Sequence, residues 1–311
     1  MEIIKHDQAI EFDYFDLFEF VDNIKISPKV KKHFDQTSIS FNEYFTKLSS
    51  YDDEFIIYFL IALARDEVTN SKKIEHTVYK DFDFRIKDLF FNKFQLSNNR
   101  IHKIHKFVMQ DQLPNKKIGS YRKTEAVVSH KTKECEEIFW YGAKPEDLKK
   151  FMNMFIKVYK STSNKEIDSN PYLKSSLMHL IFARLQPYFD GNRRTSRIIH
   201  NIKFTELINK EYGMDLKISP INLSESIDVN QVAYFKALRS IYFDLDHDNN
   251  EAINYWFNFI LNMYDEQLYV NQNLIKNMDE IAEKIDNIKQ KADKRDTRAI
   301  KKEQSRKIKA Y

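Results

Sequence analysis

The chain has 311 residues, 42% of them hydrophobic and 31% charged, and a formal net charge of +4. This composition describes a soluble globular protein that is long enough for a real core, and so small a net charge indicates neither a nucleic-acid nor a membrane partner. Only four glycines and six prolines are present, which disfavours turn-rich β architectures and predicts a mainly α-helical fold.

Cysteine usage and the apolar runs predict a cytoplasmic protein. Cys135 is the only cysteine, so no internal disulfide can form and a reducing compartment is expected. The first seven residues contain no apolar signal core. The longest apolar run, residues 55–64, is about half of the ~20 residues that a spanning helix needs. It therefore predicts a buried helix, and no membrane partner is expected.

The first half of the chain predicts helices and one β-hairpin. Residues 1–50 mix aromatic and charged side chains and are expected to form two or three short helices. Residues 52–77 predict a helix that is apolar to Ala64 and polar beyond it, as in a helix that leaves the core and ends at a wet site. Residues 84–110 predict another helix or helix pair. Residues 126–130 and 138–141 are the only good strand signal and predict a hairpin, which could serve as a flap over a site.

The second half predicts helices throughout. A proline marks the start of a helix near residue 145, a polar loop follows over 161–170, and further helices are expected near 199–212, 219–243 and 252–269. From residue 271 a narrow apolar stripe predicts a helix that extends from the body and frays near Arg295. The predicted organisation is an N-terminal helical lobe (1–95), a core with the flap at 122–142 (96–240), and C-terminal helices with a basic tail (241–311).

The stretch from His179 to Arg197 carries the strongest chemical signal. An apolar helix stops before Pro187, a short turn follows at Asp190, and a second helix opens with arginines. The free N–H groups of that second helix point at the turn and favour an anion there. With an acid and three arginines around it, the turn predicts a site for a phosphate with its metal. Two other readings are a DNA-binding helix–turn–helix, and arginines that merely neutralise Asp190 and the helix ends.

The turn resembles the motif of the Fic family, His-Pro-Phe-x-Asp/Glu-Gly-Asn-Gly-Arg-x-x-Arg. This chain reads Gln186-Pro187-Tyr188-Phe189-Asp190-Gly191-Asn192-Arg193-Arg194-Thr195-Ser196-Arg197. The resemblance extends to Gly119-Ser120-Tyr121-Arg122 before the flap and to residues 222–235 downstream, and it covers roughly residues 55–265. It implies a Fic fold, a helical bundle with a β-hairpin flap, that binds a nucleotide and commonly moves AMP from ATP to a hydroxyl of a target protein.

The resemblance also implies a role for each matched residue. Asp190 would hold Mg²⁺ against the phosphates of ATP, since a carboxylate suits a hard cation. The backbone of Gly191, Asn192 and Arg193 would cradle the phosphates, and the guanidinium groups of Arg194 and Arg197 would pair with the β- and γ-phosphates. Asn230 and Tyr234 stand where similar proteins contact the base.

Two positions depart from the family motif. Gln186 replaces the catalytic histidine, and a glutamine amide has no usable basicity near neutral pH, so general-base catalysis worth about 10²–10⁴ in rate is lost. Arg193 replaces the second glycine, where backbone must approach the ligand closely, and its side chain either crowds the phosphates or adds a charge. His179 shares a helix face with Gln186 but lies about 10 Å away, so it is interpreted as a core histidine.

A second stretch resembles the inhibitory helix of one Fic class, Ser/Thr-x-x-x-Glu-Gly/Asn. Here it is Ser71-Lys72-Lys73-Ile74-Glu75-His76, with Glu67 preceding it as in similar sequences. The resemblance implies that Glu75 pairs with Arg197 and keeps it from the γ-phosphate. The alternative is that Glu75 simply ends a solvated helix face.

Three functional readings follow. The first is a Fic-type ATP-binding protein, autoinhibited through Glu75 and impaired in AMP transfer by Gln186. The second is an active transferase with altered chemistry or a base supplied elsewhere. The third is a protein-interaction module that uses its flap and basic tail without a nucleotide. The expected partner is a target protein with a Ser, Thr or Tyr hydroxyl, and a homo-oligomer is possible.

Overall fold

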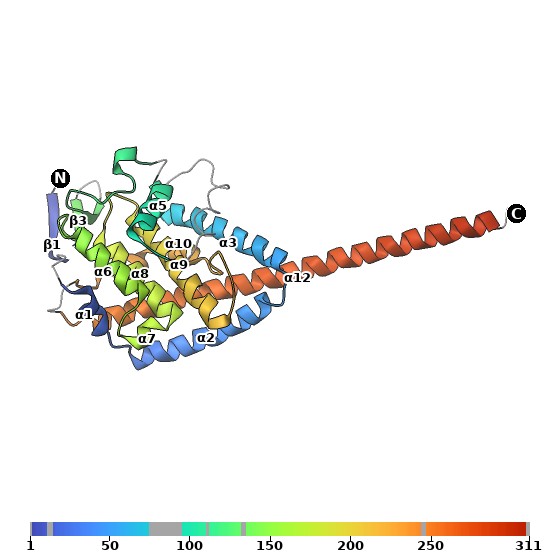
Figure 1. The fold of residues 1–311 in the computed structure, drawn as a ribbon, viewed down its shortest axis with the longest axis horizontal. Helices are drawn as coiled ribbons and strands as arrows, with labels where there is room; N and C mark the ends of the chain where they lie inside the picture. The colour runs from blue at the N-terminus through green and yellow to red at the C-terminus, as the bar shows by residue number, and fades with distance from the viewer. Residues whose placement is uncertain are drawn as a thin grey trace. The chain divides into compact units, whose positions relative to one another are not determined.

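The computed structural model describes residues 2–10, 15–74, 95–109, 112–131, 135–243 and 247–308. The chain divides into two compact units, residues 1–267 and 268–311. The described residues are mainly α-helical, which confirms the predicted fold class (Figure 1). The predicted boundaries of lobe, core and C-terminal region at residues 95 and 240 stay predictions.

Two helices form the centre of the first unit. Helix α8 (Pro171–Leu185) begins at Pro171 behind the Asn170 cap, whose side chain accepts from two backbone N–H groups. Every residue of α8 is buried, so this helix has no solvent face. Helix α9 (Asn192–Tyr212) packs against it and ends at Gly213, whose φ of 64° is the left-handed conformation typical of a helix C-terminus.

The remaining helices of this unit surround that pair (Figure 1). Asp16 caps α1 and Ser27 caps α2, each by accepting a backbone N–H, and a proline opens α2. The predicted helix over 52–77 is observed as α3, and residues 75–77 lie outside the described residues, as do residues 84–94. The bounds are α1 Leu17–Asp22, α2 Pro28–Leu48, α3 Asp53–Ile74, α5 Asn98–Met109, α6 Leu148–Lys160, α7 Lys165–Asp168, α10 Leu223–Val229 and α11 Gln231–Arg239, with a 3₁₀ turn at Asn115–Lys117.

The predicted hairpin is confirmed, and a third strand joins it. Strands β2 (Val127–Lys131) and β3 (Cys135–Tyr141) pair antiparallel. Strand β1 (Glu2–Ile10) pairs parallel with the other edge of β3, giving the order β1-β3-β2. The pairing is regular for four residues, from Glu2 opposite Cys135, and then shifts. The expectation of helices alone over residues 1–50 was therefore wrong for residues 2–10.

Helix α12 (Asn250–Ile308) is one continuous helix where two were expected. Its sequence contains neither glycine nor proline, so no residue forces a break near 270, and the helix runs past Arg295 rather than fraying there. None of the helices in the described part of the chain combines the length and apolar character that a bilayer-spanning segment requires.

Candidate functional site

The turn between α8 and α9 begins at Gln186, the one non-glycine residue with positive φ among those described. Its φ of 49° and ψ of 54° place it in the left-handed region, and its side chain is buried. The amide is engaged at both ends: Nε2 donates to the Ala183 carbonyl (2.6 Å), and Oε1 accepts from Asn192 Nδ2 (2.9 Å). This side chain therefore fastens the end of α8 to the start of α9.

Asn192 and Gly191 close the turn. The Tyr188 N–H donates to Asn192 Oδ1 (2.8 Å), and Asn192 Nδ2 also donates to the Tyr188 carbonyl (2.9 Å). Gly191 has φ 76°, and a Cβ at this position would lie 2.4 Å from the Met109 sulfur. Only glycine fits there without a shift of the packing. The Gly191 N–H donates to Asp190 Oδ1 (2.5 Å), while the Asp190 side chain is 57% exposed.

Two histidines of α5 support the turn from outside, and no sequence motif indicated them. His105 Nδ1 accepts from the Gly119 N–H (2.9 Å), so the proton of the neutral ring sits on Nε2, which donates to the Asp190 carbonyl (2.8 Å). The same ring stacks on Tyr188 with centroids 3.8 Å apart. The Tyr188 hydroxyl in turn hydrogen-bonds His102 Nδ1 (2.8 Å). These contacts fix the backbone on both sides of Asp190.

The neutral state of His105 makes the stability of the turn depend on pH. Burial lowers its pKa from 6.5 to about 4. The unfolded chain then binds more protons than the folded protein between these two values, so the stability is fully present above pH 6.5 and is lost as the pH falls towards 4. We expect the free energy of unfolding to drop in this window, by about 3 kcal/mol at most from this residue. Urea unfolding at pH 7.5, 5.5 and 4.5 measures the slope.

The matched control is His105→Gln, whose amide is uncharged throughout this pH range. This variant should lose less stability on acidification than the wild type, because one buried titrating group is gone. Equal slopes for the two proteins would contradict the assignment.

The three motif arginines lie in different surroundings. Arg194 is buried, donates from Nη1 to Gln112 Oε1 (2.6 Å), and has Nη2 3.6 Å from Asp190 Oδ1. Arg193 places its guanidinium 4.8 Å from the ring centre of Phe235 on α11. The side chain that replaces the family glycine is thus held against a neighbouring helix.

Arg197 is 2% exposed and lies close enough to Glu67 of α3 to favour the charged form of that carboxylate. Glu67 is buried, accepts from the Ser224 N–H (3.0 Å) and from Ser224 Oγ (2.6 Å), and burial nevertheless raises its pKa. Ser71 belongs to α3, and its side chain, like all of Glu75, lies outside the described residues. The predicted contact between Glu75 and Arg197 stays a prediction.

The two residues predicted to contact the base of the nucleotide make hydrogen bonds within the core and between helices. Tyr234 is fully buried, and its hydroxyl hydrogen-bonds His179 Nε2 (2.9 Å), which confirms His179 as a core histidine. Asn230 joins α10 to α11, where its Nδ2 donates to the Ser226 carbonyl (2.9 Å) and to Glu266 Oε2 (3.2 Å).

The residues of the turn fit a phosphate with its magnesium ion. The first N–H groups of α9 have no partner within the helix and point at the turn, next to the left-handed Gly191. Asp190 offers an exposed carboxylate beside them. No group of three or more metal-binding side chains occurs in the described residues, so a magnesium ion at Asp190 would draw its other ligands from phosphate oxygens and water.

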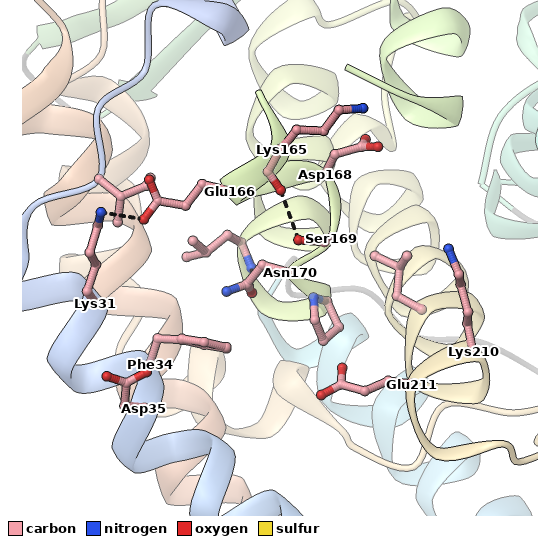
Figure 2. A pocket seen from close by; sticks show the side chains of 14 residues that line it. Lys31, Phe34, Asp35, Lys165, Glu166, Asp168, Ser169, Asn170, Lys210 and Glu211 are labelled. Atoms are coloured by element: carbon pink, nitrogen blue, oxygen red, sulfur yellow. Dashed lines mark hydrogen bonds and ion pairs between the residues drawn. The ribbon is translucent and has the colours of Figure 1, made fainter. Parts of the chain in front are cut away.

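A separate cavity of about 700 Å³ lies at the opposite ends of α8 and α9 (Figure 2). It includes Leu207, about 22 Å along α9 from Asn192 at 1.5 Å per residue. Its charges are partly paired, with Lys31 and Glu166 2.8 Å apart at the rim and Asp168 2.7 Å from Lys174. This cavity is lined by none of the site residues that the sequence predicts.

Comparison with known proteins agrees with this architecture. Residues 95–202 match the model of the Fic/DOC family. A Fic domain containing signaling protein from Bacteroides thetaiotaomicron superimposes with a TM-score of 0.57 at 16% identity, covering 79% of this chain and 97% of that chain. A Fic family protein from Desulfovibrio desulfuricans gives 0.55 at 12% identity, covering 80% and 76%.

The structure of Fic-1 from C. elegans gives a TM-score of 0.50 at 14% identity, covering 80% of this chain and 73% of that chain. No curated protein matches the chain significantly in sequence. The solved proteins share the helical bundle of this chain, which confirms the predicted fold. Residues 95–202 are therefore similar to the Fic/DOC family, and the chain shares the fold of the solved Fic proteins.

Proposed function

We propose that this protein binds ATP with Mg²⁺ at the turn between α8 and α9 and is impaired in transferring AMP to protein hydroxyls. The observation that carries the proposal is Gln186. Its amide occupies the position of the family histidine and is engaged at both ends inside the turn. An amide has no basicity to take a proton from an attacking hydroxyl, so the site retains its phosphate-binding groups without a general base.

The phosphate-binding roles follow from the chemistry of the turn. The N–H groups at the start of α9 carry the positive end of the helix dipole and suit phosphate oxygens. Arg194 lies in the first turn of α9, with its guanidinium near Asp190, so cation and carboxylate converge on the same place. Asp190 would hold Mg²⁺, which would neutralise phosphate charge when bound.

Regulation by α3 is the second part of the proposal. Glu75 would pair with Arg197 and keep it from the γ-phosphate, as the inhibitory-helix resemblance implies. The support comes from Glu67 of α3, eight residues earlier in the chain, which lies close enough to the buried Arg197 for that guanidinium to favour its charged form. Helix α3 is thus held close to the last arginine of the motif.

Calorimetric titration of ATP with Mg²⁺ tests nucleotide binding directly. The wild type should bind, and Arg194→Ala should weaken binding about 10–100-fold, because a charge-assisted hydrogen bond to phosphate is lost. Arg239→Ala is the control, since it removes an exposed cation of α11 and alters the net charge equally. A wild type that binds no nucleotide would refute the proposal and favour a protein-interaction module.

A further inference from the structure

We propose that Arg122 is a positioning residue that fixes the β2–β3 hairpin against the phosphate-binding turn. The inference rests on the proposed function, because it assigns the hairpin and the turn to the two halves of one site. Arg122 belongs to the Gly119–Arg122 stretch that precedes the hairpin.

The Arg122 side chain binds backbone carbonyls from both structures. Nε donates to the Gln186 carbonyl (2.6 Å), and Nη2 donates to the Leu185 carbonyl (3.5 Å), both at the end of α8. Nη1 donates to the Thr124 carbonyl (2.6 Å), and Nη2 also donates to the Ala143 carbonyl; these residues flank the two ends of the hairpin. One planar guanidinium thus joins four carbonyls, which no ammonium group could do in a fixed geometry.

Main-chain contacts reinforce the same junction. The Arg122 N–H donates to the Pro187 carbonyl (3.0 Å), and the Ala143 N–H donates to the Leu185 carbonyl (3.2 Å). Gly142 packs so closely that a Cβ there would lie 2.7 Å from the Cβ of Gln186 and 2.9 Å from Arg122 Nη2. The hairpin base therefore has little room to shift while this set of contacts is intact.

The position also suits a buried cation. The last carbonyls of a helix lack intrahelical donors and carry the negative end of its dipole, so a guanidinium at this point satisfies and stabilises them. Burial lowers the pKa of Arg122 to about 10, which leaves the side chain charged at neutral pH. It also supports Gln186, a non-glycine residue held in the left-handed region, which needs such support because that conformation is sparsely populated.

Loss of the Arg122 side chain should affect the turn and the hairpin differently, and mutation can distinguish the two effects. The phosphate-binding turn has its own supports in His105 and Asn192, so it should survive the loss of the Arg122 side chain. The hairpin base would keep only its main-chain bonds to α8 and its pairing with β1, and it should loosen because the side-chain bonds from Arg122 are lost. In a protein that transfers a group to a hydroxyl, such loosening reduces the turnover number and leaves nucleotide affinity unchanged.

Hydrogen–deuterium exchange tests the clamp without nucleotide. Arg122→Lys keeps the charge but loses the fork, and its peptides over 126–131 and 138–143 should exchange about 10–100-fold faster than in the wild type. Peptides of α8 and α9 should keep their protection. Gly142→Ala attacks the same junction from the hairpin side and should act alike, while Lys123→Gln, an exposed neighbour, should exchange as the wild type does. Unchanged hairpin exchange in both Arg122→Lys and Gly142→Ala would overturn the proposal.

Kinetics provide the second readout. In the Gln186→His background, Arg122→Lys should lower kcat for AMP transfer by about 10²-fold at unchanged KM for ATP. A parallel loss of ATP affinity would show general disruption and refute a positioning role. If Gln186→His transfers nothing, the exchange result alone decides the clamp. Failure of the wild type to bind ATP would remove the proposed function, and the exchange experiment would still report whether Arg122 holds the hairpin.

Discussion

Gln186→His should raise the transfer of label from α-labelled ATP to protein by about 10²–10⁴-fold over the wild type, because it supplies the missing general base. In the wild type the amide at this position links Asn192 to Ala183 and offers no lone pair of suitable basicity. The left-handed backbone at residue 186 is already in place, so the substitution adds a proton acceptor beside the residues that we propose bind phosphate.

The design of this experiment separates the base from inhibition. Gln186→His is compared with Glu75→Gly and with the double variant, since release of Arg197 would increase transfer further only if Glu75 restrains it. Gln186→Met is the matched control without a base, and Asp190→Ala in the histidine background should abolish the gain. Rapid transfer by the wild type would contradict the proposal that it is impaired in AMP transfer. The absence of transfer by both Gln186→His and the double variant would also contradict the proposal.

The second large effect concerns Arg184, whose guanidinium is completely buried two residues before Gln186. Arg184→Ala should lower the free energy of unfolding by about 3–5 kcal/mol, because a large cavity opens in the core. The side chain lies 4.9 Å from the ring of Trp140 and 5.3 Å from that of Phe243. It therefore fills the space between the hairpin and the segment after α11.

Arg184→Met separates packing from charge. Nη1 donates to the Leu238 carbonyl (2.9 Å), but Nε and Nη2 have no hydrogen-bond partner among the described residues, and burial lowers the pKa of Arg184 to about 9. A buried charge without a carboxylate is unfavourable, so an apolar side chain of similar length should be neutral or stabilising by about 1–4 kcal/mol. Urea unfolding of the three proteins measures both values. Equal losses in the alanine and methionine variants would mean that the guanidinium itself is required.

The features that could be predicted from the sequence are those that depend on residues close together along the chain. The hairpin was predictable because two β-rich runs flank a charged segment, and the turn was predictable because proline, aspartate, glycine and asparagine restrict the backbone there. Strand β1 was not, since its residues show no clear alternation and its partners lie 130 to 133 residues away. Continuity of α12 could have been inferred from the absence of glycine and proline over its length.

The supports of the site were less predictable than its motif. Arg122 binds carbonyl oxygens, which every residue type provides, so no side-chain pattern indicates its partners. The roles of His105 and Glu67 depend on how α5 and α3 pack against the turn and α9, which is tertiary information. Helix α8 shows the same limit in another way, because a helix buried on every side has no amphipathic stripe to read.

The pairing of β1 with β3 has a consequence for the order of events during synthesis. The first strand of the chain must wait for residues 135–138 before its partner exists, which at 5–20 residues per second takes roughly 7–27 s. Closing so long a loop also carries a large entropic cost, so the strand is expected to join a hairpin that has already formed. Strand β1 thus leaves the ribosome well before β3 and is expected to take its place in the sheet after the hairpin.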